Sequence, residues 1–416
     1  MKITSLTMIG NECEIIESFV RYNCHFIDEM TFVFDTGCID NTLEILRRLQ
    51  REGCPIILKD ESLVSYEQKA MENKYLRILA SDPETDMIIP LDADEFITAA
   101  ENPRTALEKL KLDRVYQMGW KNYVPFPGDD TSEKFIPKRM THCKKTEASY
   151  TKVMIPSKLV REEEIILTTG HHGVESRSKV TVEMISHIFI AHFPMISREQ
   201  YQSKIYCNNI RYITWMNRGN GEGAHLNSLL SELEAGKDNF YEGISVYDYE
   251  DQHGTVIEQE LELKYCDPEK LEIRYPELAK VDLTRNLVKT GEVMALKAYN
   301  LEIDKLDKTD RPVALIYGTG RNAELILQEI PENILNIRAY IDTHSEKKFT
   351  MFHRRIVITP EMIRCFRFDK IIISSEKFYE EMLQELIRAG IDKNKIAGRE
   401  FILNLTIEAL NNKNRS

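Results

Sequence analysis

The sequence Asp92-Ala93-Asp94-Glu95 places three carboxylates directly after an apolar run, residues 87–91. Successive side chains of a strand point to opposite faces, so we expect Asp92 and Asp94 on one side. That spacing suits one divalent ion with oxygen ligands. Mg²⁺ or Mn²⁺ there could bridge a diphosphate and stabilise a departing nucleotide. The alternative is an acidic strand end or helix cap, because two aspartates at this spacing are common by chance.

Short apolar runs alternate with helical patterns in the first part of the chain. The expected strands are residues 6–9, 30–34, 55–58 and 87–91, and the expected helices are residues 14–22, 41–51 and 66–80. Strands that alternate with helices pair in parallel, so we expect an α/β sheet with ligands at the carboxyl ends of its strands. Polar residues such as Asn11, Asp35 and Asp92 stand at those ends.

The order and spacing of these motifs resemble family 2 glycosyltransferases of the GT-A fold, in the subgroup with an Asn-Glu element and a D-x-D-E-F motif. The matching segments are Asn11-Glu12, Asp35-Thr36-Gly37-Cys38-Ile39-Asp40-Asn41-Thr42 and Asp92-Ala93-Asp94-Glu95-Phe96. The second is similar to the family's D-x-G-S-x-D-x-T, with Cys38 in place of serine. The resemblance covers residues 1–200.

The resemblance implies a role for each matching acid. The residues that would contact the nucleotide are Asn11, Glu12, Asp35 and Asp40. Asp92 would bind the ribose or the metal, and Asp94 would ligate the metal. Asp40 could also cap the helix expected at 41–51, a role that is compatible with nucleotide binding.

His192 follows an apolar run, and a buried histidine is more often a hydrogen-bonded core residue than a ligand. The resemblance implies instead that His192 completes the metal site. Residues 192–204 resemble the subgroup's His…Arg-Ser…Gln…Lys element, with Ile196 where arginine is expected. Either Arg198 or Lys204 would then supply the phosphate contact.

Inverting glycosyl transfer needs a carboxylate that deprotonates the acceptor hydroxyl. The sequence does not single one out. The candidates are Asp129, Asp130, Glu95 and Glu147, and the alternative for each is a solvated loop acid. Lys152 matches a basic position in related sequences and either faces the diphosphate or is an exposed edge-strand lysine.

A glycine-rich turn, residues 318–323, follows an apolar run and fits G-x-G-x-x-A. Gly318, Gly320 and Asp342, which ends the next expected strand, are the residues that would hold a nucleotide, with the pyrophosphate at the helix start and the acid on a ribose. The domain is short for an NAD enzyme and lacks Tyr-x-x-x-Lys, so NAD(P) is not expected. It resembles small nucleotide-binding-like domains appended to bacterial polysaccharide-biosynthesis enzymes, which implies docking, regulation or oligomerisation.

Composition limits the class of protein. The chain has 416 residues, 42% of them hydrophobic, and 55 basic against 67 acidic residues give a net charge of −12. This balance disfavours a nucleic-acid partner, because such proteins need a basic face. The eight cysteines show no zinc spacing and are expected to be reduced thiols. No signal peptide or membrane-spanning run is expected, so the predicted location is the cytoplasm, including the inner face of the membrane.

The length favours several domains. The expected fold class is α/β, with a GT-A domain at residues 1–200, a helical bridge at 201–309 and a small Rossmann-like domain at 310–416. Apolar spacing predicts helices in the bridge, and strands are expected at 313–317, 337–341 and 370–373.

These features predict a metal-dependent, inverting glycosyltransferase in bacterial cell-surface polysaccharide biosynthesis. Its cofactor would be Mn²⁺ or Mg²⁺, its donor a nucleotide diphosphate sugar, and its acceptor a glycan or a lipid-linked molecule. A homo-oligomer and peripheral membrane association are compatible with the sequence. Two alternatives stay open, which are an NAD(P)-dependent sugar oxidoreductase that uses the C-terminal domain and a non-catalytic nucleotide-sugar sensor.

Overall fold

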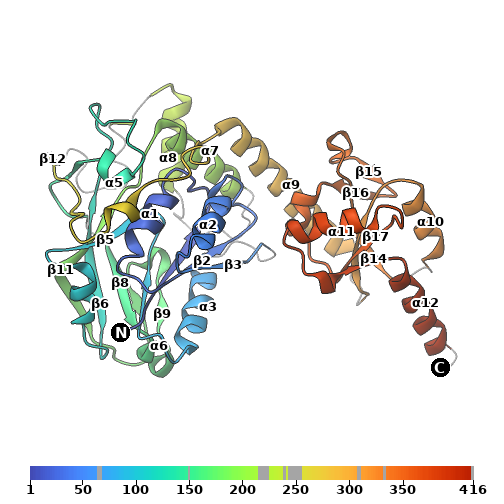
Figure 1. The fold of residues 1–416 in the computed structure, drawn as a ribbon, viewed down its shortest axis with the longest axis horizontal. Helices are drawn as coiled ribbons and strands as arrows, with labels where there is room; N and C mark the ends of the chain where they lie inside the picture. Colours follow the sequence, from blue (N-terminus) through green and yellow to red (C-terminus); the bar gives the residue numbers. More distant parts are fainter. Residues whose placement is uncertain are drawn as a thin grey trace. The chain divides into compact units, whose positions relative to one another are not determined.

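The computed structural model describes residues 1–62, 68–148, 150–213, 224–237, 240–241, 255–306, 311–330 and 334–413. The chain divides into two compact units, Met1–Gly291 and Glu292–Ser416, which we describe separately. Figure 1 shows a sheet flanked by helices in each unit.

The first unit is built on a mixed sheet. Among the described residues its strands have the order β3-β2-β1-β4-β8-β6-β11-β5. Their bounds are β1 Ile3–Ile9, β2 Glu29–Phe34, β3 Ile56–Asp60, β4 Met87–Pro90, β5 Glu95–Ala99, β6 Val115–Asn122, β8 Thr151–Pro156 and β11 Val182–His192. The first four are mutually parallel, β8 is antiparallel to both of its neighbours, and β11 runs parallel to β6 and antiparallel to β5.

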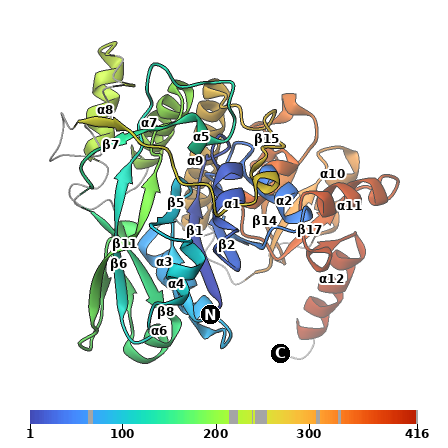
Figure 2. The ribbon, with the colours of Figure 1, turned by 60° about the vertical axis from the view of Figure 1, so that its left-hand side comes forward.

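Helices cover both faces of this sheet (Figure 2). Their bounds are α1 Ile16–Asn23, α2 Thr42–Arg51, α3 Gln68–Ser81, α4 Pro103–Glu108, α5 Ile136–Arg139, α6 Ser157–Glu163, α7 Arg198–Ile213 and α8 Ala224–Glu234. Side chains alternate between the two faces of a strand. Phe32 and Phe34 therefore pack in the core that contains α1 and α2, whereas Val33 packs in the core that contains α3 and α6.

Smaller elements complete the first unit. They are β7 His142–Lys144 paired with β12 Val256–Glu258, β9 Ile166–Leu167 paired with β10 Val174–Glu175, and the 3₁₀ turns η1 Thr169–His171 and η3 Pro268–Leu271. Leu261, Cys266 and Leu271 are buried in the core beneath α1. The segment expected as a helical bridge, residues 201–309, thus contains most of α7, all of α8 and helix α9, Leu283–Leu306, and apolar side chains of its residues 261–281 pack on the core of the first unit.

The second unit has a parallel sheet with one antiparallel edge strand. Among the described residues the strand order is β15-β16-β14-β13-β17-β18, where β13 is Val313–Tyr317, β14 Asn336–Ile341, β15 Met351–Phe352, β16 Arg355–Ile358, β17 Lys370–Ile373 and β18 Ile396–Ala397. Its other elements are α10 Arg321–Glu329, α11 Tyr379–Arg388, α12 Glu400–Lys413, and the 3₁₀ turns η4 Ser345–Lys347, η5 Pro360–Cys365 and η6 Lys393–Lys395. Helix α9, Leu283–Leu306, spans the boundary between the units.

Two apolar cores enclose the second sheet. Leu296, Leu383 and Leu386 belong to one core, and Ile326 and Ile402 belong to the other. The α/β fold class is therefore confirmed for both units, and the strands expected at 313–317, 337–341 and 370–373 are present. The domain boundaries at 200 and 310 stay predictions. No helix among the described residues is long and apolar enough to span a membrane.

Candidate active site

The polar motifs of the first unit meet at the carboxyl ends of β1, β2 and β4. These strands are adjacent and parallel, so their ends lie at one edge of the sheet. Asn11 follows β1, Asp35 follows β2, and Asp92 follows β4 after one intervening residue. The fold therefore brings together motifs that are far apart in the sequence.

Asn11 and Asp40 tie the loop after β1 to the loop after β2. Asn11 Oδ1 accepts hydrogen bonds from the backbone N–H groups of Ile39, at 2.9 Å, and Asp40, at 3.3 Å. Asp40 accepts from Cys13 N at 3.0 Å and from Thr42 N, in the first residue of α2, at 2.8 Å. Burial raises the pKa of Asp40 despite these hydrogen bonds. Both side chains thus shape the loops. The N-cap of α2 is Asn41, which makes no side-chain cap hydrogen bond, so the expectation that Asp40 is the N-cap is wrong by one residue, although its carboxylate accepts from the first N–H group of the helix.

Asp35 is almost fully buried and forms an ion pair that the sequence did not reveal. Its Oδ1 accepts from Gly37 N at 2.8 Å and lies 2.9 Å from Nη2 of Arg211 in α7. A Cβ atom added to Gly37 would lie only 1.2 Å from that Nη2. Glycine is therefore needed at position 37 for the guanidinium to reach Asp35.

Lys152 is 1% exposed and lies between two acids. Its Nζ is 2.6 Å from Asp92 Oδ2 and 2.9 Å from Glu95 Oε1. Burial opposes the charged form of Lys152, but Asp92 and Glu95 outweigh it and raise the pKa of the lysine. Strand β8 lies between β4 and β6. The interpretation of Lys152 as an exposed edge-strand residue is therefore wrong, because β8 is an interior strand.

Asp94 lies among His192, Lys204 and Glu12. Asp94 Oδ1 is 3.6 Å from His192 Nε2, and Asp94 Oδ2 is 3.4 Å from Lys204 Nζ. Burial opposes ionisation of Asp94, but Lys204 and His192 hold its pKa well below the usual range. Burial, followed by repulsion from Asp94 and neighbouring acids, raises the pKa of Glu12 to about 8. The site thus contains more acidic than basic side chains, and Lys152 and Lys204 partly neutralise its negative charge.

Asn122, at the end of β6, orients His192. His192 Nδ1 and Asn122 Oδ1 are 2.7 Å apart, and the imidazole stacks on Trp120 at 4.8 Å between ring centroids. An imidazole that donates its Nδ1–H to Asn122 has a lone pair on Nε2 when it is neutral, and an N–H directed at Asp94 when it is protonated. A hydrogen bond to the second ring nitrogen is the usual support of a metal-binding histidine. Sequence reasoning missed Asn122, because nothing local marks it.

Asp94 and His192 are the two side chains here that could supply ligands to one divalent ion. Two ligands at right angles on an ion with bonds near 2.1 Å lie about 3 Å apart, so a small closure of the 3.6 Å gap would suffice. Asp92 is held by Lys152 instead. Among the described residues, no three His, Cys, Asp or Glu side chains converge to hold a metal. The structure thus brings together two of the three predicted ligands.

The candidate bases lie in different surroundings. Asp129 accepts from Phe126 N at 2.8 Å and lines a cavity of about 850 Å³. Burial raises its pKa. Asp130 is exposed and accepts from Ser132, Glu147 is also exposed, and Glu95 is completely buried. Of these acids, Asp129 combines partial burial with a position on a cavity.

Because Ile196 stands where an arginine is expected, either Arg198 or Lys204 was expected to contact the phosphate. Arg198 lies over the rings of Phe240 and Tyr241, at 5.3 and 5.2 Å from their centroids. Lys204 reaches Asp94. Lys204 is therefore the one of the two that stands at the acidic site.

The glycine-rich turn of the second unit lies at the carboxyl ends of its parallel strands, and α10 begins directly after Gly320. Gly318 has a φ of 114°, and a Cβ there would lie 2.3 Å from Ser374 Oγ. Asp342 accepts from Thr319, and its oxygens are 2.8 Å from Lys347 Nζ and from His344 Nδ1. Burial opposes ionisation of Asp342, but these donors hold its pKa well below the usual value.

Comparison with known proteins gives one family match and several distant structural likenesses. Residues 312–397 match the family model C2185-like, N-terminal. No curated protein matches the chain. TarS 1–349 from S. aureus is 11% identical over 73% of this chain and 80% of its own, with a TM-score of 0.29.

Two other solved structures show a similar degree of likeness. HddC from Yersinia pseudotuberculosis is 8% identical over 47% of this chain and 95% of its own, with a TM-score of 0.29. A nucleotidyl transferase from Methanothermobacter thermautotroptrophicus is 11% identical over 39% and 74%, with a TM-score of 0.22. Likeness at this level carries no argument about activity, so the site itself must support any function.

Proposed function

We propose that this chain is a glycosyltransferase that moves a sugar from a nucleotide diphosphate donor to a glycan acceptor with inversion. The observation that carries the proposal is the group of Asp94, His192 and Lys204 beside the carboxyl ends of parallel strands, where nucleotides bind in α/β sheets. The resemblance of the strand-end motifs to family 2 glycosyltransferases supports the same function.

In this proposal the donor diphosphate lies beside Lys204, whose side chain is 26% exposed. Asp94 and His192 would hold Mn²⁺ or Mg²⁺ together with phosphate oxygens and water. Such an ion supplies charge neutralisation for a departing diphosphate. The buried Lys152 fixes the carboxylate of Asp92, which is 37% exposed and free to contact a ribose hydroxyl with its remaining lone pairs.

Asp129 is the proposed general base. It would accept the proton of an acceptor hydroxyl while that oxygen bonds to the anomeric carbon of the donor sugar. The bond from that carbon to the diphosphate oxygen breaks at the same time, and its electron pair leaves with the nucleoside diphosphate. Attack opposite to the leaving group inverts the anomeric centre. Burial, which raises the pKa of Asp129, makes it a stronger base than an exposed aspartate.

The acceptor's biological role is also a proposal. A surface polysaccharide under synthesis, free or lipid-linked, is consistent with the resemblance of the C-terminal unit to domains appended to bacterial polysaccharide-biosynthesis enzymes. The C-terminal unit would then serve docking, regulation or oligomerisation.

Thermal unfolding of the protein with UDP, GDP, CDP and their sugars, with and without Mn²⁺, tests donor binding. A ligand that binds only the folded state stabilises it by RT ln(1 + L/Kd), where L is the ligand concentration, so the midpoint rises with the ligand concentration. We expect one nucleotide series to stabilise the protein, more strongly with Mn²⁺. Stabilisation by NAD(H) alone would instead favour an oxidoreductase, and binding of a nucleotide sugar without any turnover would favour a sensor.

A further inference from the structure

We propose that the cavity of about 850 Å³ in the first unit is a binding site for a neutral, polyhydroxylated acceptor of the size of a mono- or disaccharide. The inference rests on the proposed function, to which it adds the class of the second substrate. Arg198, one of the two cations expected to contact the donor phosphate, lines this cavity, whereas Asp94, His192 and Lys204 do not. Its volume lies within the range of small-molecule sites in proteins.

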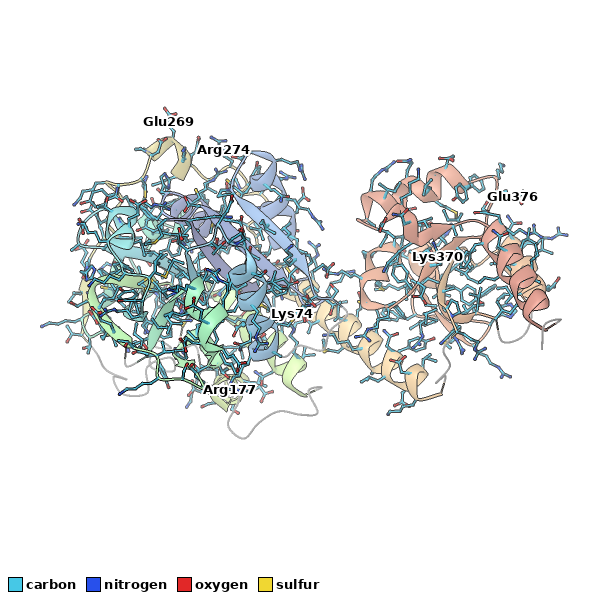
Figure 3. The ribbon with its side chains drawn as sticks, turned by 90° about the horizontal axis from the view of Figure 1, so that it is seen from below. Lys74, Arg177, Glu269, Arg274, Lys370 and Glu376 are labelled. Carbon is cyan, nitrogen blue, oxygen red and sulfur yellow. The ribbon has the colours of Figure 1, made fainter. Side chains whose placement is uncertain are left out.

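Hydrogen bonds and ion pairs hold two walls of the cavity in place. Glu17 of α1 accepts from the backbone N–H groups of Arg274, at 2.8 Å, and Tyr275, at 3.0 Å, which anchors the wall at residues 273–281. Arg274 also pairs with Glu52 at 2.8 Å, and Figure 3 labels Arg274 together with Glu269 of the preceding turn η3. The cavity is thus preformed on this side, which reduces the cost of ordering a bound ligand.

A second wall is the loop that contains the candidate base, Asp129. Ser18 Oγ accepts from Ile136 N at 3.1 Å, and the half-buried Arg139 donates to Glu14, at 3.3 Å, and to the carbonyl of Ile196, at 3.0 Å. Ser197 donates to Glu14 at 2.5 Å. These contacts fix the loop on α1 and on the segment that leads to α7.

The chemistry of the lining fits sugar hydroxyls. Four cationic and five acidic side chains are among the described residues that line the cavity, so their charges nearly cancel and no strong field selects an anion. Carboxylates accept, and arginines and lysines donate, the many hydrogen bonds that a sugar offers. Phe126, 42% exposed, and Tyr241, 41% exposed, add apolar ring surface for the C–H face of a pyranose. One face of the Phe126 ring is already supported by His142, at 3.9 Å between ring centroids.

Two chain segments connect the cavity to the acidic site. Ile196 and Ser197 line the cavity only a few residues beyond His192, and Glu14 lines it two residues beyond Glu12. Asp129 lines the cavity itself. An acceptor bound in the cavity would therefore present a hydroxyl to Asp129, the proposed base.

Saturation-transfer NMR with the neutral disaccharides cellobiose, lactose and chitobiose, at millimolar concentration, tests the site in the full-length protein. We expect transfer to at least one of them, a loss of about fivefold or more in Phe126→Ala, and a similar loss in Tyr241→Ala. Phe378→Ala is the matched control, because Phe378 is a comparably exposed ring, at 49%, in the second unit. Unchanged thermal midpoints would show that the variants fold.

Two results would overturn the inference. One is the absence of transfer to every disaccharide, and the other is transfer that persists undiminished in both cavity variants. Inorganic phosphate serves as an anionic probe, and binding of phosphate to the cavity without any disaccharide would also overturn it. Nucleotide binding, measured in parallel, is expected to be unchanged in Phe126→Ala. Disaccharide binding in a protein that binds no nucleotide would contradict the proposed function but keep the saccharide site.

Discussion

The guanidinium of Arg211 lies against Gly37 and is 2.9 Å from the carboxylate of Asp35. Asp35 is 3% exposed in this pair. A nucleoside that uses Asp35 must therefore displace Arg211 or share the carboxylate with it. Arg211 of helix α7 thereby contacts the loop that follows β2, although 176 positions separate it from Asp35.

We expect Arg211→Ala to strengthen nucleoside binding by about three- to tenfold, because a partly exposed ion pair of ~1 kcal/mol no longer competes for Asp35. Isothermal titration with uridine, guanosine and cytidine measures the effect. Arg211→Lys, which keeps the charge, is the matched control and should bind like the wild type. Weaker binding in Arg211→Ala would show that the arginine is itself a ligand contact.

Lys152→Met should destabilise the first unit by about 3–5 kcal/mol, because it leaves Asp92 and the fully buried Glu95 without their shared cation. Urea unfolding of the full chain measures the loss. Adding Glu95→Gln to the same chain should recover part of it, since one buried charge is then removed. A Lys152→Met single variant that is as stable as the wild type would contradict the buried ion pairs of Lys152.

The two glycines of the C-terminal turn should respond differently to alanine. Gly318→Ala combines a positive φ with a Cβ only 2.3 Å from Ser374 Oγ, and should cost about 1–3 kcal/mol of stability. Gly320→Ala meets no atom within 4 Å and should cost less than about 1 kcal/mol. Thermal unfolding compares the two variants, and equal losses would contradict this difference.

Gly320→Ala also tests the oxidoreductase alternative without disturbing the fold. In a dinucleotide site the second glycine lets the backbone approach the pyrophosphate. If NAD(H) stabilises the wild type and no longer stabilises Gly320→Ala, the C-terminal unit binds a dinucleotide at this turn. We expect no NAD(H) stabilisation in either protein, because Asp342 is already paired with Lys347 and His344.

The sequence predicted the strand ends well, for a physical reason. Apolar runs of strand length between helical patterns force parallel pairing, and parallel strands place their polar ends at one edge. Asp35, Asp92 and Asp94 could therefore be assigned to a common site from the sequence alone. Gly37 carried a weaker signal, because a glycine in a loop indicates a close approach but does not identify the approaching atom.

The partners of these acids could not be predicted in the same way. Lys152 lies in β8, which is antiparallel to β4 through long-range pairing that local periodicity does not encode. Asn122 comes from the end of β6, and Arg211 from α7. Each becomes part of the site only through tertiary packing. The pairing of Asp92 with Lys152, and not with the proposed metal ligands, also depends on tertiary packing.

The central claim is tested most directly by the release of nucleoside diphosphate from the donor that binds, measured with Mn²⁺ for the wild type, Asp94→Asn and Asp113→Asn. Asp113 is an exposed aspartate, at 61%, paired with Arg114, and its variant controls for charge. We predict metal-dependent turnover in the wild type and in Asp113→Asn, and a loss of about 10²-fold or more in Asp94→Asn, as expected for the removal of a group that stabilises charge in the transition state. Full activity and unchanged metal dependence in Asp94→Asn would contradict the account.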